Sequence, residues 1–453
     1  MTKEKIVDVV AFIDQERFGS FQITIVVICA LIAMLDGFDT QAMAFAAPAI
    51  AAKLDLNVSS FGPVFGAVLL GLMLGALVMA PVADRYGRKP IIIGSLAFFG
   101  IFSLSTVLAT SIPELILLRF LTGLGLGGAM PNVISLTSEY SPARLRATMI
   151  STMFCGFPLG AVLGGILAAR MIPVFGWQSV FILGGIIPLL MVPILVFILP
   201  ESVRYMTARG DTRSKISGIL SKISGDSEID PNSVFIVTEK KSKGFPVSHL
   251  LSEGRATRTI LLWITFFMNL LMLYFLASWL PSVLRQAGIP IERAIISTVL
   301  LNLGGIFGAL VLARISDRAG PYRILTASYL GAAAFTYALG ISGLAFPTLM
   351  AIVFLTGFCV IGAQINMNAL AAEAYPTTIR STGVGWALGI GRIGSIIGPV
   401  VGGLLLSANI GTPSLFMAAA LPGVIAAVAV VVLSRAKTLG VETAVVSQVE
   451  VGH

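Results

Sequence analysis

Two acidic side chains stand three residues apart inside a long apolar segment near the start of the chain. Asp36 and Asp39 belong to the motif Asp-Gly-Phe-Asp, within a run from about Phe21 to Ile50 that is otherwise uncharged. Residues at this spacing share one face of an α-helix. A carboxylate at membrane depth is costly unless it is paired, hydrated or protonated. We therefore expect this pair to have a function, and the first question is which charge balances it.

An arginine in the fourth apolar segment is the candidate counter-charge. Arg119 interrupts an apolar helix that starts near Pro113. With a rise of about 1.5 Å per residue and a hydrocarbon core of about 30 Å, Asp36 and Arg119 both lie roughly 21–22 Å from the same membrane surface. A pair between them would offset part of the cost of burying both charges. The alternative is a static pair with a structural role only.

A second arginine, Arg392, lies close to the middle of the eleventh apolar segment, roughly 15 Å deep by the same helical rise. A guanidinium without a partner in its own helix can hold a carboxylate through two parallel hydrogen bonds. We therefore expect Arg392 to bind an anion; the alternative is a hydrogen bond to helix carbonyls. Amides in apolar helices more often hold helices together, so the polar and aromatic neighbours are weaker candidates. These are Asn269, Tyr274, Trp279, Gln364, Asn366, Asn368 and Trp386.

The elements that must position these residues are membrane helices. Hydrophobic residues make up 56% of the chain and charged residues 11%, against roughly a quarter charged in soluble proteins. A membrane-spanning helix needs about 20 mostly apolar residues, and by that measure the chain supplies about twelve. The expected centres are Leu35, Leu70, Leu96, Gly125, Gly156, Ile187, Leu271, Gly308, Leu330, Gly357, Ile393 and Val424.

The placement of charge explains the net charge of +8 without any affinity for nucleic acid. Most of the 30 Lys and Arg residues fall in the tails and in alternate loops, which lie on one side of the membrane if the number of helices is even. The positive-inside rule places that side, and both termini, in the cytoplasm. The three cysteines all fall within apolar segments, so we expect neither a disulfide framework nor a metal site.

The two halves of the chain repeat each other at an offset of 233 to 234 residues. Asp84-Arg85 recurs as Asp317-Arg318, and Phe120-Leu-Thr-Gly123 recurs as Phe354-Leu-Thr-Gly357. One register maintained across helices and loops indicates an internal duplication. Arg119 and Arg392 are not duplicated, because their counterparts are Val353 and Pro158. This asymmetry indicates a role specific to each half.

The duplication and the polar segments divide the chain into five parts. An N-terminal cytoplasmic segment (1–20) precedes the first six-helix half (21–199). A Ser-, Lys- and Asp-rich cytoplasmic loop (200–258) separates it from the second six-helix half (259–434), and a cytoplasmic tail (435–453) ends the chain. We therefore predict an all-α membrane protein with twelve transmembrane helices in two halves. Such halves are the architecture of the major facilitator superfamily, whose substrates bind near the midplane between the halves.

Charged residues at the inner ends of the helices form a candidate conformational latch. The loop Asp84-Arg85-Tyr86-Gly87-Arg88-Lys89 resembles the signature loop of that superfamily, with Ala80 where the signature has glycine. Ion pairs at one membrane face can break and re-form as two halves rock. Each exposed pair contributes under about 1 kcal/mol, so such pairs bias an equilibrium without locking it. The expected latch residues are Asp84, Arg85, Arg88, Glu139, Arg146, Glu201, Asp317, Arg318, Glu373 and Arg380.

Several motifs together resemble one branch of the superfamily, the aromatic acid:proton symporters. The resemblance rests on Asp36-Gly-Phe-Asp39, on Arg119-Phe-Leu-Thr-Gly with its continuation to Asn132, and on Gly389-Ile-Gly-Arg392-Ile-Gly. Tyr274-Phe-Leu-x-x-Trp279-Leu-Pro also resembles the seventh helix of that family. The likeness extends over essentially the whole chain. It implies uptake of benzoate-like carboxylates with protons across a bacterial inner membrane, with Asp36, Asp39, Arg119 and Arg392 as functional residues.

We therefore expect a monomeric symporter, with protons, a small organic carboxylate and the lipid bilayer as its partners and with no cofactor. Asp36, Asp39 and Arg119 would form the proton-responsive cluster. Which carboxylate carries the proton stays open, as do the proton stoichiometry and the identity of the substrate. Residues expected to contact the substrate are Arg392, Arg119, Tyr274, Gln364, Asn366 and Trp386.

Three alternatives remain. An efflux antiporter is disfavoured, because the fifth segment has Gly160-x3-Gly164-Gly165 without the proline that such antiporters carry there. Symport of another organic anion or of a sugar-like solute is a closer alternative, since Pro200-Glu201-Ser202 also occurs in sugar porters. An enzyme is not expected, because the chain shows no nucleophile–base constellation or metal-ligand spacing.

Overall fold

The computed structural model describes residues 6–450 apart from 211–212, 226–228, 231, 238–247, 252–254, 342–343, 376–379 and 409. Among helical residues whose side chains it does not describe are Asp84, Asp317, Glu373, Arg380 and residues 436–450. In the described part of the chain, eleven helices are long and apolar enough to cross a membrane. The chain divides into two compact units, Met1–Ala42 with Ala67–Lys241, and Met43–Gly66 with Ser242–His453.

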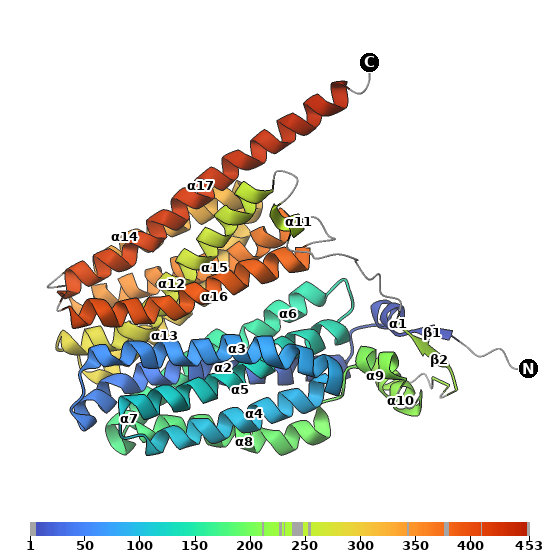
Figure 1. Ribbon diagram of the computed structural model, residues 1–453, viewed down its shortest axis with the longest axis horizontal. Helices are drawn as coiled ribbons and strands as arrows, with labels where there is room; N and C mark the ends of the chain where they lie inside the picture. The colour runs from blue at the N-terminus through green and yellow to red at the C-terminus, as the bar shows by residue number, and fades with distance from the viewer. Residues whose placement is uncertain are drawn as a thin grey trace, which may run out of the picture. The chain divides into compact units, whose positions relative to one another are not determined.

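The first unit contains the N-terminal membrane helices (Figure 1). Two of these, α2 and α3, also contribute to the second unit through residues 43–66, which include the short 3-10 helix η1 (Val58–Phe61). The fifth expected segment is divided into α6 and α7, which follow each other at Cys155. The helices of this unit are α2 (Ser20–Leu54), α3 (Gly62–Tyr86), α4 (Arg88–Ser105), α5 (Ile112–Tyr140), α6 (Arg146–Phe154), α7 (Gly156–Phe175) and α8 (Gln178–Ile198), with the 3-10 helix η2 (Thr106–Leu108) after α4.

The second unit repeats the succession of long helices. Its α14 occupies the position of the ninth expected membrane segment and has 19 residues, but it is not among the eleven apolar candidates. Of the twelve predicted membrane helices, the described residues therefore contain eleven candidates. The elements are α11 (Ser248–Leu251), α12 (Ala256–Gln286), α13 (Ile291–Ala319), α14 (Pro321–Leu339), α15 (Phe346–Ala374), α16 (Arg380–Ser407) and α17 (Thr412–Glu450).

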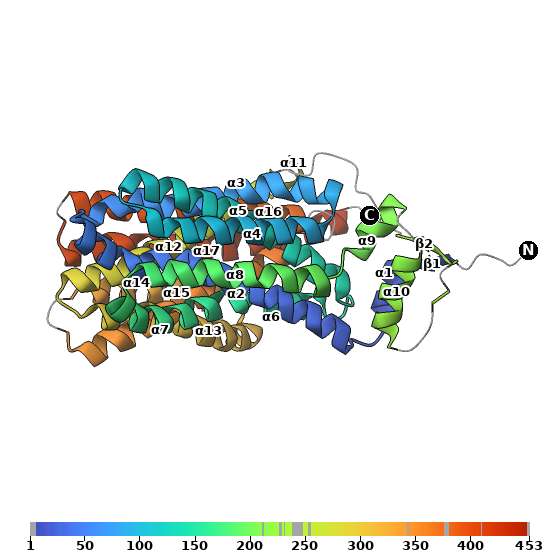
Figure 2. The same ribbon diagram turned by 90° about the horizontal axis from the view of Figure 1, so that it is seen from below.

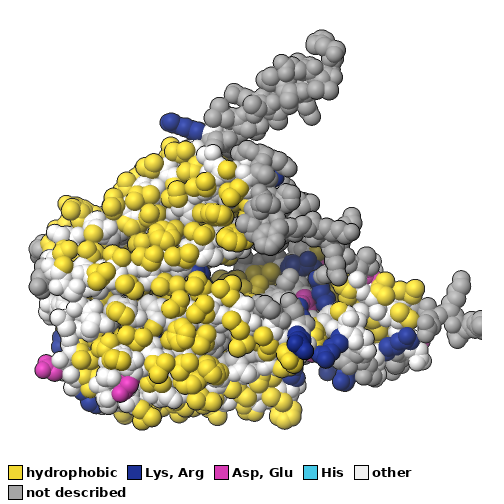
Figure 3. All heavy atoms as spheres, in the orientation of Figure 1, with side chains coloured by type: hydrophobic (Ala, Val, Ile, Leu, Met, Phe, Trp, Pro, Cys, Tyr) yellow, Lys and Arg dark blue, Asp and Glu magenta, His cyan; other side chains and the backbone are white. Residues whose placement is uncertain are grey.

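Hydrophobic side chains cover the sides of the long helices (Figure 3). On α8, for example, Leu190 and Phe197 are 64% and 86% exposed. Apolar residues displayed this widely would be unfavourable in water but suit contact with lipid. The exposed faces therefore agree with the membrane-spanning assignment.

Small residues allow the helices to approach backbone to backbone. A Cβ atom on Gly37 of α2 would overlap the carbonyl oxygen of Phe157 in α7. In the same way, a Cβ on Gly160 of α7 would overlap the carbonyl oxygen of Met34. Close packing through small residues is the common mode of helix association in membranes, where lipid tails remove the hydrophobic driving force. This contact sets the rotation of α2 and therefore the direction in which its two aspartates point.

A small α/β module in the first unit was not predicted from the sequence. It comprises β1 (Ile6–Asp8), α1 (Val9–Gln15), α9 (Val203–Arg209), α10 (Arg213–Ser224) and β2 (Val234–Ile236), which lie beyond the ends of the membrane helices (Figure 2). Strand β1 pairs in parallel with β2, with Val7 opposite Phe235. Asp8 caps α1 by accepting hydrogen bonds from two backbone N–H groups. The all-α prediction is confirmed for the membrane helices, and it did not include these two strands because three residues are too few to show a periodic pattern.

Candidate functional site

A fully buried ion pair joins α2 to α5 in the first unit. Arg119 donates from Nη1 to Asp39 Oδ1 at 3.1 Å and from Nη2 to Asp39 Oδ2 at 2.5 Å. Nη2 also donates to the backbone carbonyl oxygen of Asp39 at 2.9 Å. Both side chains have no exposed area. This two-point arrangement is the strongest geometry for a guanidinium and a carboxylate.

Neighbouring helices complete the surroundings of this pair. Ser103 of α4 donates its hydroxyl to Asp39 Oδ1 at 3.0 Å, and the guanidinium of Arg119 lies 5.5 Å from the ring centre of Phe181 in α8. The Nε atom of Arg119 is buried and has no hydrogen-bond partner among the described residues. Four helices of the unit therefore meet at one neutralised charge pair. The Nε–H group of its guanidinium has no acceptor among the described residues.

Asp36 lies one turn earlier on α2 and is 3% exposed. Its Oδ1 accepts a hydrogen bond from the hydroxyl of Thr40 at 3.2 Å. The depth estimate pointed to Asp36 as the partner of Arg119, but the carboxylate that Arg119 holds through two nitrogens is Asp39. The estimate assumed where each helix enters the membrane, and a shift of one turn is enough to exchange the two aspartates. Ser103 and Thr40 were not predicted as part of the site, because single hydroxyl residues are common in membrane helices.

The second unit contains the other membrane arginine. Arg392 of α16 is half-buried, and its Nη1 lies 3.4 Å from the hydroxyl oxygen of Tyr274 in α12. In the part of the chain that the structure describes, no carboxylate lies within ion-pairing distance of Arg392. Arg392 and Tyr274 stand near the midpoints of their helices. Arg392 is therefore a partly desolvated cation with a long phenol contact, in contrast to the neutralised Arg119.

A chain of amides lies between α12 and α15. Asn269 Nδ2 donates to Gln364 Oε1 at 2.6 Å, and Gln364 Nε2 donates to Asn368 Oδ1 at 3.2 Å. Asn366 is placed differently, because its Nδ2 donates to the carbonyl oxygens of Gly362 at 2.8 Å and Ala309 at 3.5 Å. Its counterpart in the repeat makes the same contact within its own helix, since Asn132 Nδ2 donates to the carbonyl oxygen of Gly128. These contacts suit a scaffold role for Asn366 better than the expected substrate contact.

The two tryptophans noted in the sequence have different surroundings. Trp386 of α16 stacks on Trp263 of α12, with ring centres 5.8 Å apart, and is 43% exposed. It precedes Arg392 by six residues, which is about 9 Å of helical rise. Trp279 is almost fully buried and donates its Nε1 to the carbonyl oxygen of Pro399 at 2.8 Å. Trp279 therefore joins α12 to α16 rather than lining an open site.

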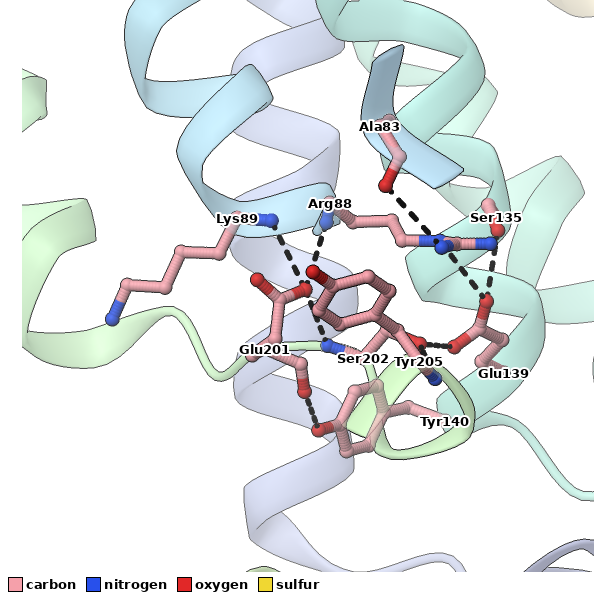
Figure 4. A network of polar contacts seen from close by, with 9 residues as sticks. All are labelled: Ala83, Arg88, Lys89, Ser135, Glu139, Tyr140, Glu201, Ser202 and Tyr205. Carbon is pink, nitrogen blue, oxygen red and sulfur yellow. Dashed lines mark hydrogen bonds and ion pairs between the residues drawn. The ribbon is translucent and has the colours of Figure 1, made fainter. Parts of the chain in front are cut away.

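Three of the expected latch residues, Arg88, Glu139 and Glu201, form one network at the ends of α4, α5 and α8 (Figure 4). Arg88 Nε lies 3.7 Å from Glu139 Oε1, and the Glu139 carboxylate also accepts hydrogen bonds from the hydroxyls of Ser135 and Ser202. Glu201 Oε1 accepts from the backbone N–H groups of Arg88 at 2.8 Å and Lys89 at 3.3 Å, which begin α4. A carboxylate at this position satisfies the unpaired N–H groups of a helix start and interacts favourably with its dipole.

The other expected latch residues are placed differently. Arg146 lies 3.6 Å from Asp14, which the sequence did not single out, and donates to the carbonyl oxygen of Ser138 at 3.1 Å. Arg85 and Arg318 are exposed. The side chains of Asp84, Asp317, Glu373 and Arg380 lie outside the described residues. The structure thus brings together Arg88, Glu139 and Glu201, and it assigns Arg146 to a contact with the N-terminal segment.

Several long apolar helices with charged side chains inside them are typical of a polytopic membrane transporter. The family profile "Major Facilitator Superfamily" matches residues 29–347 and 303–445, and the chain belongs to this family. It is a membrane transporter and not an enzyme, as the sequence predicted.

Several curated proteins are similar over nearly their whole length. The chain is 41% identical to a 4-hydroxybenzoate transporter of Pseudomonas putida, covering 94% of this chain and 96% of the relative. It is also 41% identical to a gallate transporter of the same species, covering 95% of this chain and 96% of the relative. A benzoate transport protein of Acinetobacter baylyi is 30% identical, covering 94% and 93%. These relatives are aromatic acid transporters of the major facilitator superfamily.

Solved structures share the fold at low sequence identity. The partially occluded inward-open xylose transporter XylE from E. coli superimposes with a TM-score of 0.71 at 17% identity, covering 90% of this chain and 97% of that chain. A bacterial homologue of the lysosomal transporter Spinster gives a TM-score of 0.72 at 18% identity, covering 92% and 98%. At this identity the likeness establishes the major facilitator fold alone.

Proposed function

We propose that this protein is a proton-coupled symporter that imports an aromatic monocarboxylate across the inner membrane of a bacterium. It would act as a monomer with twelve membrane helices and with both termini in the cytoplasm. The two six-helix halves, 21–199 and 259–434, would alternate access to the substrate. The similarity to 4-hydroxybenzoate, gallate and benzoate transporters supports the substrate class.

The observation that carries the proposal is the difference between the two membrane arginines. Arg119 is already neutralised by Asp39, whereas no described carboxylate neutralises Arg392. A half-buried guanidinium loses part of its hydration, so an anion that replaces this hydration binds favourably. A substrate carboxylate fits this position, with the hydroxyl of Tyr274 as a second donor. A neutral sugar-like solute would leave the charge of Arg392 unbalanced, which favours an anionic substrate.

The aspartate cluster would couple this binding to protons. Protonation of a carboxylate in the cluster weakens its attraction for Arg119 and lowers the electrostatic cost of moving the loaded site through the membrane. The unused Nε donor of Arg119 allows the guanidinium to exchange partners without losing all of its hydrogen bonds. Arg88, Glu139 and Glu201 would act as a latch that is remade in each cycle.

The proposal is tested through Arg392 in proteoliposomes that contain the purified protein and carry an inwardly directed proton gradient. Replacement Arg392→Gln is expected to lower kcat/KM for 4-hydroxybenzoate uptake by about a hundredfold or more, because the substrate carboxylate loses its charged partner. Arg392→Lys retains the charge without the two-point geometry. Its kcat/KM is expected to lie between that of the unmodified protein and that of Arg392→Gln.

Arg285→Gln is the matched control, because Arg285 is an exposed arginine in the last turn of α12. This variant is expected to transport like the unmodified protein. Uptake by Arg392→Gln at the unmodified kcat/KM would contradict the assignment of Arg392. An absence of uptake of every aromatic acid by the unmodified protein would contradict the proposed function itself.

A further inference from the structure

Among the buried side-chain atoms of the second unit that lack a hydrogen-bond partner within the described residues, one belongs to a side-chain amide. Asn269 is 1% exposed, and its Oδ1 atom is buried and accepts no hydrogen bond from the described residues. Its Nδ2 atom is held by Gln364, so the side-chain amide cannot rotate freely. Buried acceptors in folded proteins are nearly always paired, and an exception requires an explanation.

The other buried asparagines of the membrane helices are bound differently. Asn132, Asn302 and Asn366 each donate Nδ2 to the carbonyl oxygen four residues earlier in their own helix. Such contacts satisfy the side-chain amide within its own helix. Asn366 also lies 3.5 Å from the carbonyl oxygen of Ala309 in α13. Asn269 instead donates to a neighbouring helix, through an amide chain that extends from Gln364 to Asn368. These hydrogen bonds between amides fix the orientation of the Asn269 side chain, and its Oδ1 atom has no hydrogen-bond donor among the described residues.

Asn269 Oδ1 lies on the same helix as Tyr274, which contacts Arg392. Asn269 precedes Tyr274 on α12 by five residues, which is about 7.5 Å of helical rise. The side of α12 that contains Phe267 and Leu271 packs against α16, because Gly394 and Gly398 approach their carbonyl oxygens. Asn269 is turned toward α15, where Gln364 lies. A ligand that contacts Arg392 and Tyr274 with one end and Asn269 with the other would therefore extend along α12 from its α16 side to its α15 side.

We propose that Asn269 binds a ring hydroxyl of the substrate, so that the transporter selects hydroxylated aromatic acids over unsubstituted ones. The carboxylate would lie at Arg392 and Tyr274, and a hydroxyl at the opposite end of the ring would donate to Asn269 Oδ1. A phenolic hydroxyl both donates and accepts. It would therefore pair with Asn269 even if the amide chain were reversed in polarity. This inference rests on the proposed function and adds a selectivity to it.

The first experiment uses the unmodified full-length protein and three acids that differ at one ring position. Uptake into proteoliposomes is measured for 4-hydroxybenzoate, 4-fluorobenzoate and benzoate under the same proton gradient. We expect kcat/KM for 4-hydroxybenzoate to exceed that of both other acids by about tenfold, because only the phenol satisfies the buried acceptor. Equal kcat/KM for the phenol and the fluoro analogue overturns this inference but leaves the proposed function intact.

The second experiment assigns the preference to Asn269. Asn269→Leu is close in volume but has no polar atoms. It is expected to lower the ratio of kcat/KM for 4-hydroxybenzoate to kcat/KM for benzoate about tenfold. Gln364→Leu releases the amide of Asn269 and is expected to reduce the same ratio, which provides a second reading if Asn269→Leu folds poorly.

Asn302→Leu is the matched control, because it removes a buried asparagine that is bound within its own helix. Any loss of stability in this variant should lower the uptake of both acids by the same factor. The assignment of the preference to Asn269 is overturned if the ratio of the two kcat/KM values is unchanged in Asn269→Leu. It is also overturned if this ratio falls by the same factor in Asn302→Leu. Failure of the unmodified protein to transport any of the three acids refutes the proposed function instead.

Discussion

Arg119 and Arg392 are the same residue type in two opposite electrostatic situations. Arg119 has no exposed area, and Asp39 holds it through two hydrogen bonds. Removing one partner of a buried pair leaves an uncompensated charge, which typically destabilises by about 3–5 kcal/mol. Arg392 is only half-buried and pairs with no described carboxylate. The first arginine is therefore suited to hold α2 against α5, whereas the second is suited to bind an anion.

The two aspartates are expected to respond differently to replacement. Asp39→Asn removes the charge that balances Arg119 and should lower the thermal unfolding temperature of the purified protein, consistent with a loss of about 3–5 kcal/mol. Asp36→Asn keeps an oxygen that can accept from Thr40, so it is expected to lower the unfolding temperature less than Asp39→Asn does. It should still exchange labelled for unlabelled 4-hydroxybenzoate across the membrane, but it should no longer accumulate substrate in response to a proton gradient.

Exchange and gradient-driven accumulation are measured on the same proteoliposomes, so the comparison is internal. Normal accumulation by Asp36→Asn would remove Asp36 from the coupling step. An unfolding temperature of Asp39→Asn equal to that of the unmodified protein would show that the buried pair contributes little to stability.

At the scale of elements, glycine contacts decide which face of each helix meets its neighbour. Helices α2 and α7 approach so closely that Gly37 and Gly160 have no room for a Cβ atom. Because side chains follow the helical rotation, this contact also determines that Asp39 points toward α4 and α5. The site is therefore positioned by residues that take no part in its chemistry.

Replacement Gly160→Ala tests this contact, because the added methyl group overlaps the carbonyl oxygen of Met34 and forces the helices apart. Overpacking of this kind costs about 1–3 kcal/mol, and we expect a lower unfolding temperature together with reduced uptake. Gly94→Ala is the control, because a Cβ on Gly94 of α4 meets no atom within 4 Å. Alanine is the better helix former, so this variant should be unchanged or slightly stabilised. Equal behaviour of the two variants would contradict the packing argument.

At the scale of the whole molecule, the first unit combines membrane helices with a small module built from both its ends. Residues 6–15 and 203–236 are distant in sequence, yet β1 pairs with β2. Asp14 accepts from the backbone N–H of Ala143 and lies 3.6 Å from Arg146, so the N-terminal segment also holds the loop between α5 and α6. The amphipathic N-terminal residues are thus part of a folded structure.

A cysteine pair tests this module in a variant whose three native cysteines are replaced. Paired strands lie about 4.8 Å apart, which suits a disulfide, so Val7→Cys with Phe235→Cys should cross-link under mild oxidation. Val7→Cys with Arg170→Cys is the control, because Arg170 is an exposed residue near the far end of α7. The cross-link is detected by mass spectrometry as a disulfide-linked pair of peptides after proteolysis without reducing agent. Its absence in the first pair, or its formation in both, would contradict the strand pairing.

The sequence alone determined the properties that depend on short stretches of chain or on their repetition. Runs of about 20 apolar residues predicted membrane helices, the offset of the repeats predicted two related halves, and the narrow motifs around Asp36, Arg119 and Arg392 indicated the symporter branch. These signals are strong because length, composition and register do not require knowledge of how the helices are packed.

Only the tertiary structure decided which side chains meet. The pairing of Arg119 with Asp39 rather than Asp36 depends on the rotation and depth of α2, which its contact with α7 sets. The stacking of Trp386 on Trp263 and the amide chain that leaves Asn269 Oδ1 open depend on contacts between helices far apart in sequence. Rotation of one helix against another leaves no trace in its own hydrophobic run, so these contacts could not be predicted from the residues alone.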